Sequence, residues 1–176
     1  METSHFLIIF LISLSLFFFE FTLSLDTITS IQSIRDGTTL VSSGQTFELG
    51  FFSPVNSKNR YIGIWYKIMT PDVVVWVANR NSPLNDSFGE FAIGENGNLV
   101  LLDRAKGIVW SSNASRVAKD PVAQLLDNGN LVLRESESVS PESFLWQSFD
   151  YPSDTLLQGM KLGWDIVESC RRSIGW

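Results

Sequence analysis

Cysteine and histidine are almost absent from this 176-residue sequence, and their scarcity removes whole classes of function. Cys170 is the single cysteine, so no intrachain disulfide can form and packing must stabilise the fold. The single histidine, His5, lies in an amino-terminal segment that we expect to be removed. Ser–His catalysis, Cys–His catalysis and the common zinc sites are therefore excluded, and the sequence implies neither a metal nor a cofactor.

Motifs for nucleotide chemistry are also missing, because the sequence contains no GxGxxG, no P-loop and no HRD or DFG triplet. Paired carboxylates, as in glycosidases, would have to come from Asp150 with Asp154 or Glu135 with Glu137. These residues lie among Ser and Pro, where solvated loop charges are the simpler interpretation. We therefore expect that the chain is not an enzyme.

Basic residues are few and scattered, with 13 Lys and Arg against 19 Asp and Glu. The net charge of −6 becomes −4 if Glu2 and Glu20 are removed with a leader. No basic stripe could follow a phosphate backbone, so we expect no binding to nucleic acid.

A long apolar run occurs only at the amino terminus, from Phe6 to Phe19, before Glu20 and the small-residue pattern Thr22-Leu23-Ser24. This pattern is typical of a secretory signal peptide cleaved near Ser24. An uncleaved membrane anchor is the alternative, but a span needs about 18 or more apolar residues and Glu20 interrupts the run. We expect residues 1–24 to be a signal peptide, and the mature form to be secreted without spanning a membrane.

Short apolar runs follow from Thr27 onward, separated by Gly, Pro, Asn, Asp and Ser and without a sustained helical period. This pattern predicts an all-β fold for one domain, residues 25–150. The predicted strands are Thr38–Val41, Thr46–Phe52, Tyr61–Lys67, Val73–Ala78, Glu90–Ile93, Leu99–Asp103, Ile108–Ser111, Ala123–Leu126, Leu131–Arg134 and Phe144–Gln147.

The hexapeptide Asn-Gly-Asn-Leu-Val-Leu occurs twice, at 96–101 and at 128–133. Asn-Gly between strands is typical of a type I′ turn, in which both central residues have positive φ. We therefore expect both copies to be hairpin turns that lead into strands.

Three tryptophans repeat with the hexapeptide: Trp76, Trp110 and Trp146 are spaced by 34 and 36 residues. Such a period predicts three similar units. A unit of two or three strands cannot bury its apolar face alone, so three small sheets should close around these indoles as the structural core. Exposed platforms that stack on sugars are the alternative role for the indoles.

Two N-glycosylation sequons lie in predicted loops, at Asn85-Asp86-Ser87 and Asn113-Ala114-Ser115. Together with a secretory leader, they predict a glycoprotein carrying a glycan on at least one of the two asparagines.

Four segments carry a resemblance to a known family: Phe47-Glu48-Leu49-Gly50-Phe51-Phe52-Ser53-Pro54, Tyr61-Ile62-Gly63-Ile64-Trp65-Tyr66, Val75-Trp76-Val77-Ala78-Asn79-Arg80 and Leu145-Trp146-Gln147-Ser148-Phe149-Asp150-Tyr151-Pro152-Ser153-Asp154-Thr155-Leu156. The sequence from Asp26 to Trp164 resembles the bulb-type, mannose-binding lectin domain of plant S-domain receptor kinases and S-locus glycoproteins. The resemblance implies a β-prism II fold, with three four-stranded antiparallel sheets in pseudo-threefold symmetry, and secretion to the apoplast.

The resemblance also implies a sugar motif, Gln-x-Asp-x-Asn-x-Val-x-Tyr, whose side chains share one strand face. At the five motif positions the first copy has Gly94, Asn96, Asn98, Val100 and Leu102, and the second has Leu126, Asn128, Asn130, Val132 and Arg134. Three of five positions have changed in each copy. The candidate sugar-binding residues are Asn96, Asn98, Val100, Asn128, Asn130 and Val132, although turn and strand requirements explain the same residues.

The resemblance stops at about residue 165, within a carboxy-terminal extension, residues 151–176. The cysteine-rich modules, membrane span and kinase of full-length receptors do not appear in the sequence. We expect a truncated, frameshifted or alternatively spliced message. Three hypotheses follow: a module binding a mannose-type glycan or glycoprotein, a module or decoy binding a receptor ectodomain or peptide ligand, or a non-functional remnant.

Overall fold

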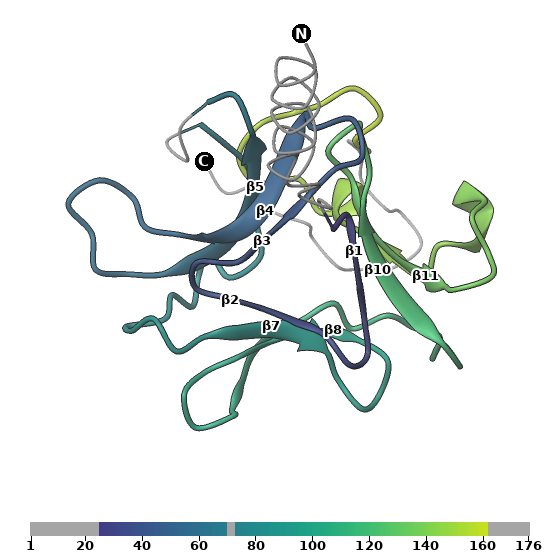
Figure 1. The fold of residues 1–176 in the computed structure, drawn as a ribbon, viewed down its shortest axis with the longest axis horizontal. Coiled ribbons are helices and arrows are strands. Elements are labelled where there is room, and N and C mark those ends of the chain that lie inside the picture. Colours follow the sequence, from purple (N-terminus) through teal and green to yellow (C-terminus); the bar gives the residue numbers. More distant parts are fainter. Residues whose placement is uncertain (1–24, 70–72, 162–176) are drawn as a thin grey trace, which may run out of the picture.

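The fold, described by a computed structural model for residues 25–69 and 73–161, consists of three four-stranded antiparallel sheets around a common axis (Figure 1). This confirms the expected all-β architecture. The expected signal peptide, Cys170 and the diverging tail lie outside the described residues. Within those residues, no helix is long and apolar enough to cross a membrane.

The three sheets are named A, B and C. Sheet A has the order β1 (Thr27–Thr29), β10 (Pro121–Leu125), β11 (Leu131–Glu135) and β12 (Trp146–Gln147). Sheet B has the order β2 (Ser33–Arg35), β7 (Glu90–Ile93), β8 (Leu99–Leu102) and β9 (Ile108–Ser111). Sheet C has the order β3 (Thr39–Val41), β4 (Phe47–Phe52), β5 (Tyr61–Tyr66) and β6 (Val74–Val77). Two 3-10 helices, η1 (Pro141–Ser143) and η2 (Ser148–Asp150), flank β12.

The first three strands each join a different sheet, β1 beside β10, β2 beside β7 and β3 beside β4. Residues 25–41 therefore connect all three sheets at their edges. The sequence analysis did not predict β1 and β2, because each has only three residues and its partner strand lies far along the chain. The remaining ten strands were all predicted from the sequence, and they differ from the prediction only by small shifts at their ends.

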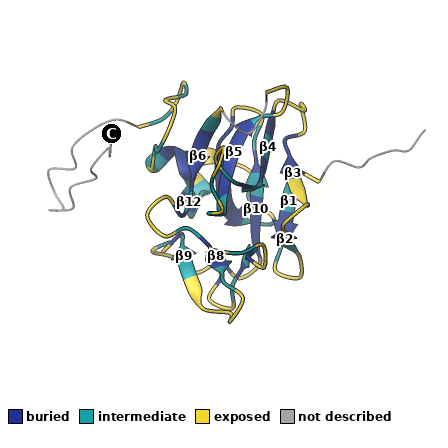
Figure 2. Cartoon of the chain, turned by 90° about the vertical axis from the view of Figure 1, so that its left-hand side faces the viewer, coloured by how far each residue is buried: buried dark blue, intermediate teal, exposed yellow. Residues whose placement is uncertain are grey.

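One inner strand of each sheet, β5, β8 or β11, points its side chains alternately toward the axis and toward the outside. The inward residues are Ile62 and Ile64 in β5, Leu99 and Leu101 in β8, and Leu131 and Leu133 in β11. All six are fully buried in one core, and Figure 2 shows the burial concentrated on the strands. Burying each such side chain stabilises the fold by about 1.5–3 kcal/mol. Because the inward residues supply this stability, the outward residues of the same strands can serve a binding site.

The segment after η2 packs along the edge of sheet C. The Thr155 N–H donates to Val75 O at 3.1 Å, and the Val77 N–H donates to Ser153 Oγ at 2.8 Å. The indole N–H of Trp76 donates to Tyr151 O at 2.9 Å. These bonds fix residues 151–155 beside β6.

Candidate functional site

The repeated hexapeptides form the β7–β8 and β10–β11 hairpins, as expected, but the turn type differs. In the first loop the Gly94 N–H donates to Asn98 O and the Gly97 N–H donates to Gly94 O, both at 2.8 Å. The second loop repeats both bonds. Gly97 and Gly129 have φ of 74° and 85°, whereas the asparagine before each has no positive φ. The type I′ prediction is wrong, and each loop has three residues with the glycine last and left-handed.

The asparagine side chains that precede the glycines stabilise these loops. Asn96 Oδ1 accepts the Asn98 N–H at 3.2 Å, and Asn128 Oδ1 accepts the Asn130 N–H at 3.0 Å. Such a bond from a side chain to the main chain two residues on is a common turn device. Asn96 and Asn128 are otherwise exposed, so each retains an amide that solvent or a ligand can reach.

The second copy uses the whole carboxamide of Asn130 within the protein. Its Nδ2 donates to Gln147 Oε1 at 2.9 Å. Its Oδ1 accepts the Ser148 hydroxyl and the Phe149 N–H, both at 3.2 Å. Asn130 is also buried, so its oxygen is fully used and its nitrogen already donates to Gln147.

Val132, in the same copy, is fully buried and lies between two glutamines on the neighbouring strands, Gln124 and Gln147. Arg134 replaces the tyrosine of the motif and reaches across to Gln124, with Nε at 3.2 Å and Nη2 at 3.0 Å from Oε1. Long polar side chains therefore surround Val132, and it exposes no surface against which a sugar ring could pack.

The first copy differs in its amide. Asn98 is buried, and its Oδ1 accepts the Ser112 hydroxyl at 3.0 Å and the Ala114 N–H at 2.7 Å. Its Nδ2 donates to no acceptor among the described residues, because Ser111 stands where the second copy has a glutamine. Val100 is buried here as well. Within the described part of the chain, the Nδ2 group of Asn98 is therefore free in the first copy, whereas that of Asn130 in the second copy already donates to Gln147.

Strand β5 of sheet C, which was predicted as a strand, is a third copy of the motif strand that was not recognised from the sequence. In each of β8, β11 and β5, the main-chain N–H of the first inward-pointing residue donates to a side-chain oxygen that lies two or three residues after a tryptophan of the cluster. The three bonds are Leu99 N–H to Ser112 Oγ at 3.1 Å, Leu131 N–H to Ser148 Oγ at 2.9 Å, and Ile62 N–H to Asn79 Oδ1 at 3.0 Å. By this equivalence Tyr61 and Gly63 occupy the motif's Asn and Val positions, and Trp65 its Tyr position. The hexapeptide is absent here, so only the tryptophan period could have indicated the third copy.

The three tryptophans meet at the axis of the fold. Trp76 lies 5.8 Å from both Trp110 and Trp146, and those two lie 5.7 Å apart, measured between ring centroids. The interplanar angles of 77°, 65° and 75° are edge-to-face arrangements, which aromatic rings favour. Trp76 and Trp146 are buried and Trp110 is half-buried, so the geometry is that of a core cluster rather than a row of sugar platforms.

Both sequon asparagines are exposed, Asn85 beyond the Arg60–Leu84 bridge and Asn113 after β9. Asn113 has φ of 47°, in the left-handed region that asparagine tolerates. Because the N–H of the next residue, Ala114, bonds to Asn98, a glycan on Asn113 would lie beside the first copy.

Three of the four carboxylates considered for catalysis have structural partners, and the fourth, Glu137, is exposed. Asp150 pairs with Lys161 at 2.8 Å, and Asp154 pairs with Arg80. Glu135 accepts two main-chain N–H groups. In residues 25–69 and 73–161 no three His, Cys, Asp or Glu side chains gather into a metal-binding cluster.

A family model described as D-mannose binding lectin matches residues 73–176, more than half of the chain. The chain is 46% identical over 169 residues to receptor-like serine/threonine-protein kinase SD1-8 of Arabidopsis thaliana, covering 94% of the chain and 20% of that protein. It is 48% identical over 177 residues to S-locus-specific glycoprotein BS29-2 of Brassica oleracea var. alboglabra, covering 97% of the chain and 40% of that protein. The chain thus spans less than half the length of either relative.

Solved structures share the fold at low sequence identity. A Marasmius oreades lectin superposes with a TM-score of 0.53 at 15% identity, covering 70% of this chain and 90% of that chain. A monomeric monocot mannose-binding lectin from Gastrodia elata gives 0.51 at 16% identity, covering 70% of this chain and 96% of that chain. With the three sheets around their tryptophan axis, these matches identify the β-prism II fold. The chain therefore belongs to the D-mannose binding lectin family, with close relatives among the G-type lectin receptor-like kinases and the S-locus glycoproteins.

Proposed function

We propose that the chain is a secreted, extracellular recognition module without enzymatic activity, and that it binds mannose-type glycans through the first copy of the repeated hexapeptide. Membership of a mannose-binding family supports the class of ligand. The observation that carries the choice of site is the free amide donor of Asn98, beside the exposed Asn96. In the second copy the equivalent nitrogen, Asn130 Nδ2, already donates to Gln147.

Binding at this site should be weak. Gly94 and Leu102 stand where sugar-binding members have glutamine and tyrosine, and Val100 is buried. Each missing hydrogen bond to a buried partner reduces the binding free energy by about 1–3 kcal/mol. Useful affinity would then require several modules to engage a glycoprotein at once.

N-glycosylation belongs to the same proposal. We infer that Asn85 and Asn113 carry glycans, because both side chains are exposed and the sequence predicts a secretory leader. The glycan on Asn113 would lie next to Asn98 and would compete with an external glycan. Binding should therefore rise when Asn113 is replaced by Gln.

A glycan array tests this function, using the full chain secreted from plant cells and then treated with an endoglycosidase. We expect binding to mannose-terminated glycans that soluble mannose displaces. Asn96→Ala should remove this binding and Asn128→Ala should not, although both lose the same turn bond. No mannose-dependent signal, or equal loss in the two variants, would reject the site.

Recognition of a protein, either a receptor ectodomain or a peptide ligand, is the second candidate function. It is favoured by the outward face of sheet C, where the position equivalent to the sugar site carries aromatic and aliphatic side chains instead of amides. Co-precipitation with S-domain receptor ectodomains that added mannose does not disrupt would support it. Complete displacement by mannose would count against it.

A further inference from the structure

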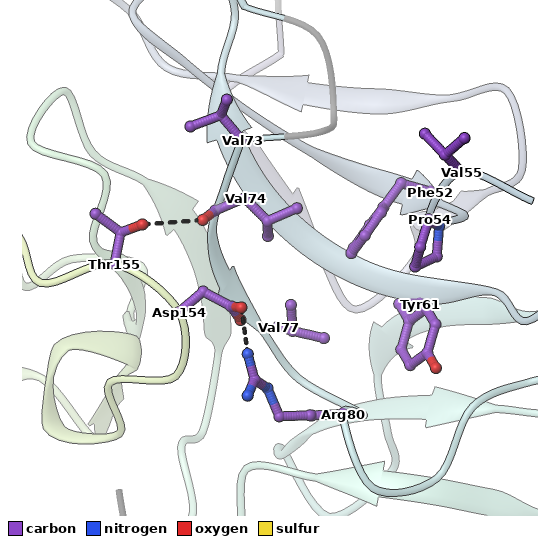
Figure 3. Close-up of a pocket in the computed structure, with 10 residues that line it drawn as sticks. All are labelled: Phe52, Pro54, Val55, Tyr61, Val73, Val74, Val77, Arg80, Asp154 and Thr155. Carbon is purple, nitrogen blue, oxygen red and sulfur yellow. Dashed lines mark hydrogen bonds and ion pairs between the residues drawn. The ribbon is translucent and has the colours of Figure 1, made fainter. Parts of the chain in front are cut away.

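The outward face of sheet C is hollowed into a pocket of about 630 Å³, within the range of about 300–1,000 Å³ of ligand pockets. Figure 3 shows Phe52, Pro54, Val55 and Tyr61 on one side and Asp154 with Thr155 on the other. Valines of β6 lie between the two sides. Residues far apart in the sequence thus build one cavity outside the central core.

A glycine at the centre of β5 makes room for the ring of Phe52, which forms one wall of this pocket. Gly63 stands where the other two central strands carry a valine, and a Cβ there would lie 2.7 Å from Phe52 Cε1. The ring of Phe52 instead packs over the strand, 5.7 Å from Tyr61 and 6.2 Å from Trp65 between centroids. The aromatic wall therefore exists because β5 has no side chain at this position.

The walls favour an apolar occupant over a sugar. Phe52 and Trp65 are buried with Val77 in a small cluster that is separate from the core. At the rim, Val55 and Val73 expose 71% and 46% of their surface to water. A sugar ring needs closely spaced polar partners, whereas this lining has polar groups mainly at one end.

That polar end is the ion pair of Arg80 with Asp154, visible at the edge of the pocket in Figure 3. The two side chains are 44% and 28% exposed. Only one guanidinium nitrogen, Nη2, bonds to Asp154, and within the described residues the other donors of Arg80 have no acceptor. A guanidinium can bind a second carboxylate with these free N–H groups.

The main chain at Asp154, the ion-pair partner of Arg80, is anchored in the structure without a ligand. Asp154 lies between Ser153, which accepts the Val77 N–H, and Thr155, whose hydroxyl donates to Val74 O at 3.2 Å. Anchoring on both sides lowers the entropy lost on binding. The structure thus presents an apolar pocket next to an arginine that pairs with an anchored carboxylate.

We propose that this pocket binds an extended segment of a partner protein, in which a bulky apolar side chain is followed closely by an Asp, Glu or carboxy-terminal carboxylate. The apolar side chain packs in the pocket against Phe52, Val55 and Tyr61, and the carboxylate binds Arg80. The proposal deepens the protein-recognition candidate and does not depend on the glycan site. A glycan or a second copy of the chain would be a different occupant.

Selection from a random 12-residue peptide phage library, against the full secreted chain, tests the proposal. We expect enrichment of peptides with an aromatic or large aliphatic residue shortly before an acidic residue. Enriched peptides are then synthesised and measured by fluorescence anisotropy. Absence of enrichment, or enrichment without the apolar–acidic pattern, would overturn the proposal.

Matched variants locate the site. Val55→Asp and Arg80→Glu should each weaken binding of the selected peptides by about tenfold or more, because each places a negative charge next to the acidic bound peptide. Val139→Asp and Arg104→Glu change an equally exposed valine and another ion-paired arginine outside the pocket, and should change affinity less than about twofold. Equal effects in the two pairs would place the peptide elsewhere, and thermal melts confirm that all four variants are folded.

Two further measurements separate this proposal from the glycan function. Asn96→Ala should leave peptide affinity unchanged, and Arg80→Glu should leave the glycan-array signal unchanged. Sedimentation velocity with and without Val55→Asp detects a second copy as the occupant. Displacement of the peptide by mannose, or a dimer that Val55→Asp dissociates, would reject a peptide as the natural occupant.

Discussion

At the scale of single residues, the role of an asparagine depends on the side chain opposite it. Asn98 and Asn130 have the same neighbours in sequence and both are buried. Gln147 is long enough to accept the Asn130 amide, whereas Ser111 leaves the Asn98 amide without an acceptor among the described residues. The Asn130 amide is therefore engaged within the described fold, whereas the Asn98 amide nitrogen is not.

Asn130→Ala should lower the free energy of unfolding by about 1–3 kcal/mol, because buried hydrogen-bonding groups on residues 147–149 lose their partner. Urea denaturation followed by fluorescence measures the change. Asn81→Ala, at an exposed loop position, is the control and should stay within about 0.5 kcal/mol. A similar loss in both variants would contradict the structural role of Asn130.

Glu90 is held by two cations on neighbouring strands and loops. Hydrogen bonds from Lys106 first, and then from Arg35 and Ser33, lower the pKa of Glu90 from its ordinary 4.5 to about 2. Because the pKa of Glu90 is lower in the folded than in the unfolded state, ionised Glu90 stabilises the fold. This stabilisation is complete above pH 4.5 and is lost as the pH falls towards 2. The carboxylate thus ties β2 and the β8–β9 loop to β7 at neutral pH.

Glu90→Gln should be less stable than the natural protein at pH 7 by about 1–2 kcal/mol, a reduced figure because both cations are largely exposed. The difference should shrink as the pH falls from 4.5 and disappear near 2. Urea titrations at several pH values measure it. Glu137→Gln, at an exposed site, serves as the control. A loss of unfolding free energy for Glu90→Gln that stays the same at every pH would contradict the lowered pKa of Glu90.

At the scale of elements, the short strands β1, β2 and β3 join the three sheets through the first described residues. Each has three residues, too few to be stable without its partner strand. Ile28 in β1 is fully buried in the central core. We infer that this segment stabilises the closed prism, because it contacts sheets that are otherwise formed by separate parts of the chain.

Ile28→Ala should lower the free energy of unfolding by about 2–5 kcal/mol, as expected for a buried isoleucine. Ile31→Ala, three residues later and 95% exposed, is the matched control and should stay within about 0.5 kcal/mol. Thermal and urea unfolding of both variants provide the comparison. A loss of less than 1 kcal/mol for Ile28→Ala, below the range above, would show that β1 contributes little.

At the scale of the whole molecule, one indole from each sheet meets the other two at the axis. No sheet can separate without breaking contacts made by both of the others. We therefore expect the domain to unfold as one cooperative unit. The same closure keeps the three outward faces in fixed positions, so the proposed glycan site on sheet B and the pocket on sheet C are presented on different sides.

Trp146→Ala should destabilise the fold by about 3–5 kcal/mol while leaving unfolding cooperative. Far-UV circular dichroism and tryptophan fluorescence should give coincident urea transitions. Val139→Ala, at an exposed loop position, should leave the midpoint unchanged. Separate transitions for the two probes would mean that sheet A unfolds before the others.

The sequence by itself determined the features that depend on neighbours along the chain. Alternating apolar residues defined ten strands, Asn-Gly located two hairpins, and the tryptophan period indicated three units. The turn type was mispredicted because the side chains of Asn96 and Asn128 bond to main-chain groups and the residues before them complete the loops.

Only the tertiary structure decided which strands join which sheet and which asparagine of the described chain keeps an unbonded amide nitrogen. It alone also showed that sheet C, which contains the third copy of the motif strand, carries a pocket. Each depends on groups brought together from distant parts of the sequence, such as β1 with β10 or Arg80 with Asp154. Hydrogen bonds and side-chain contacts across sheets have no local signature, because one strand's pattern does not specify which residue will lie opposite it.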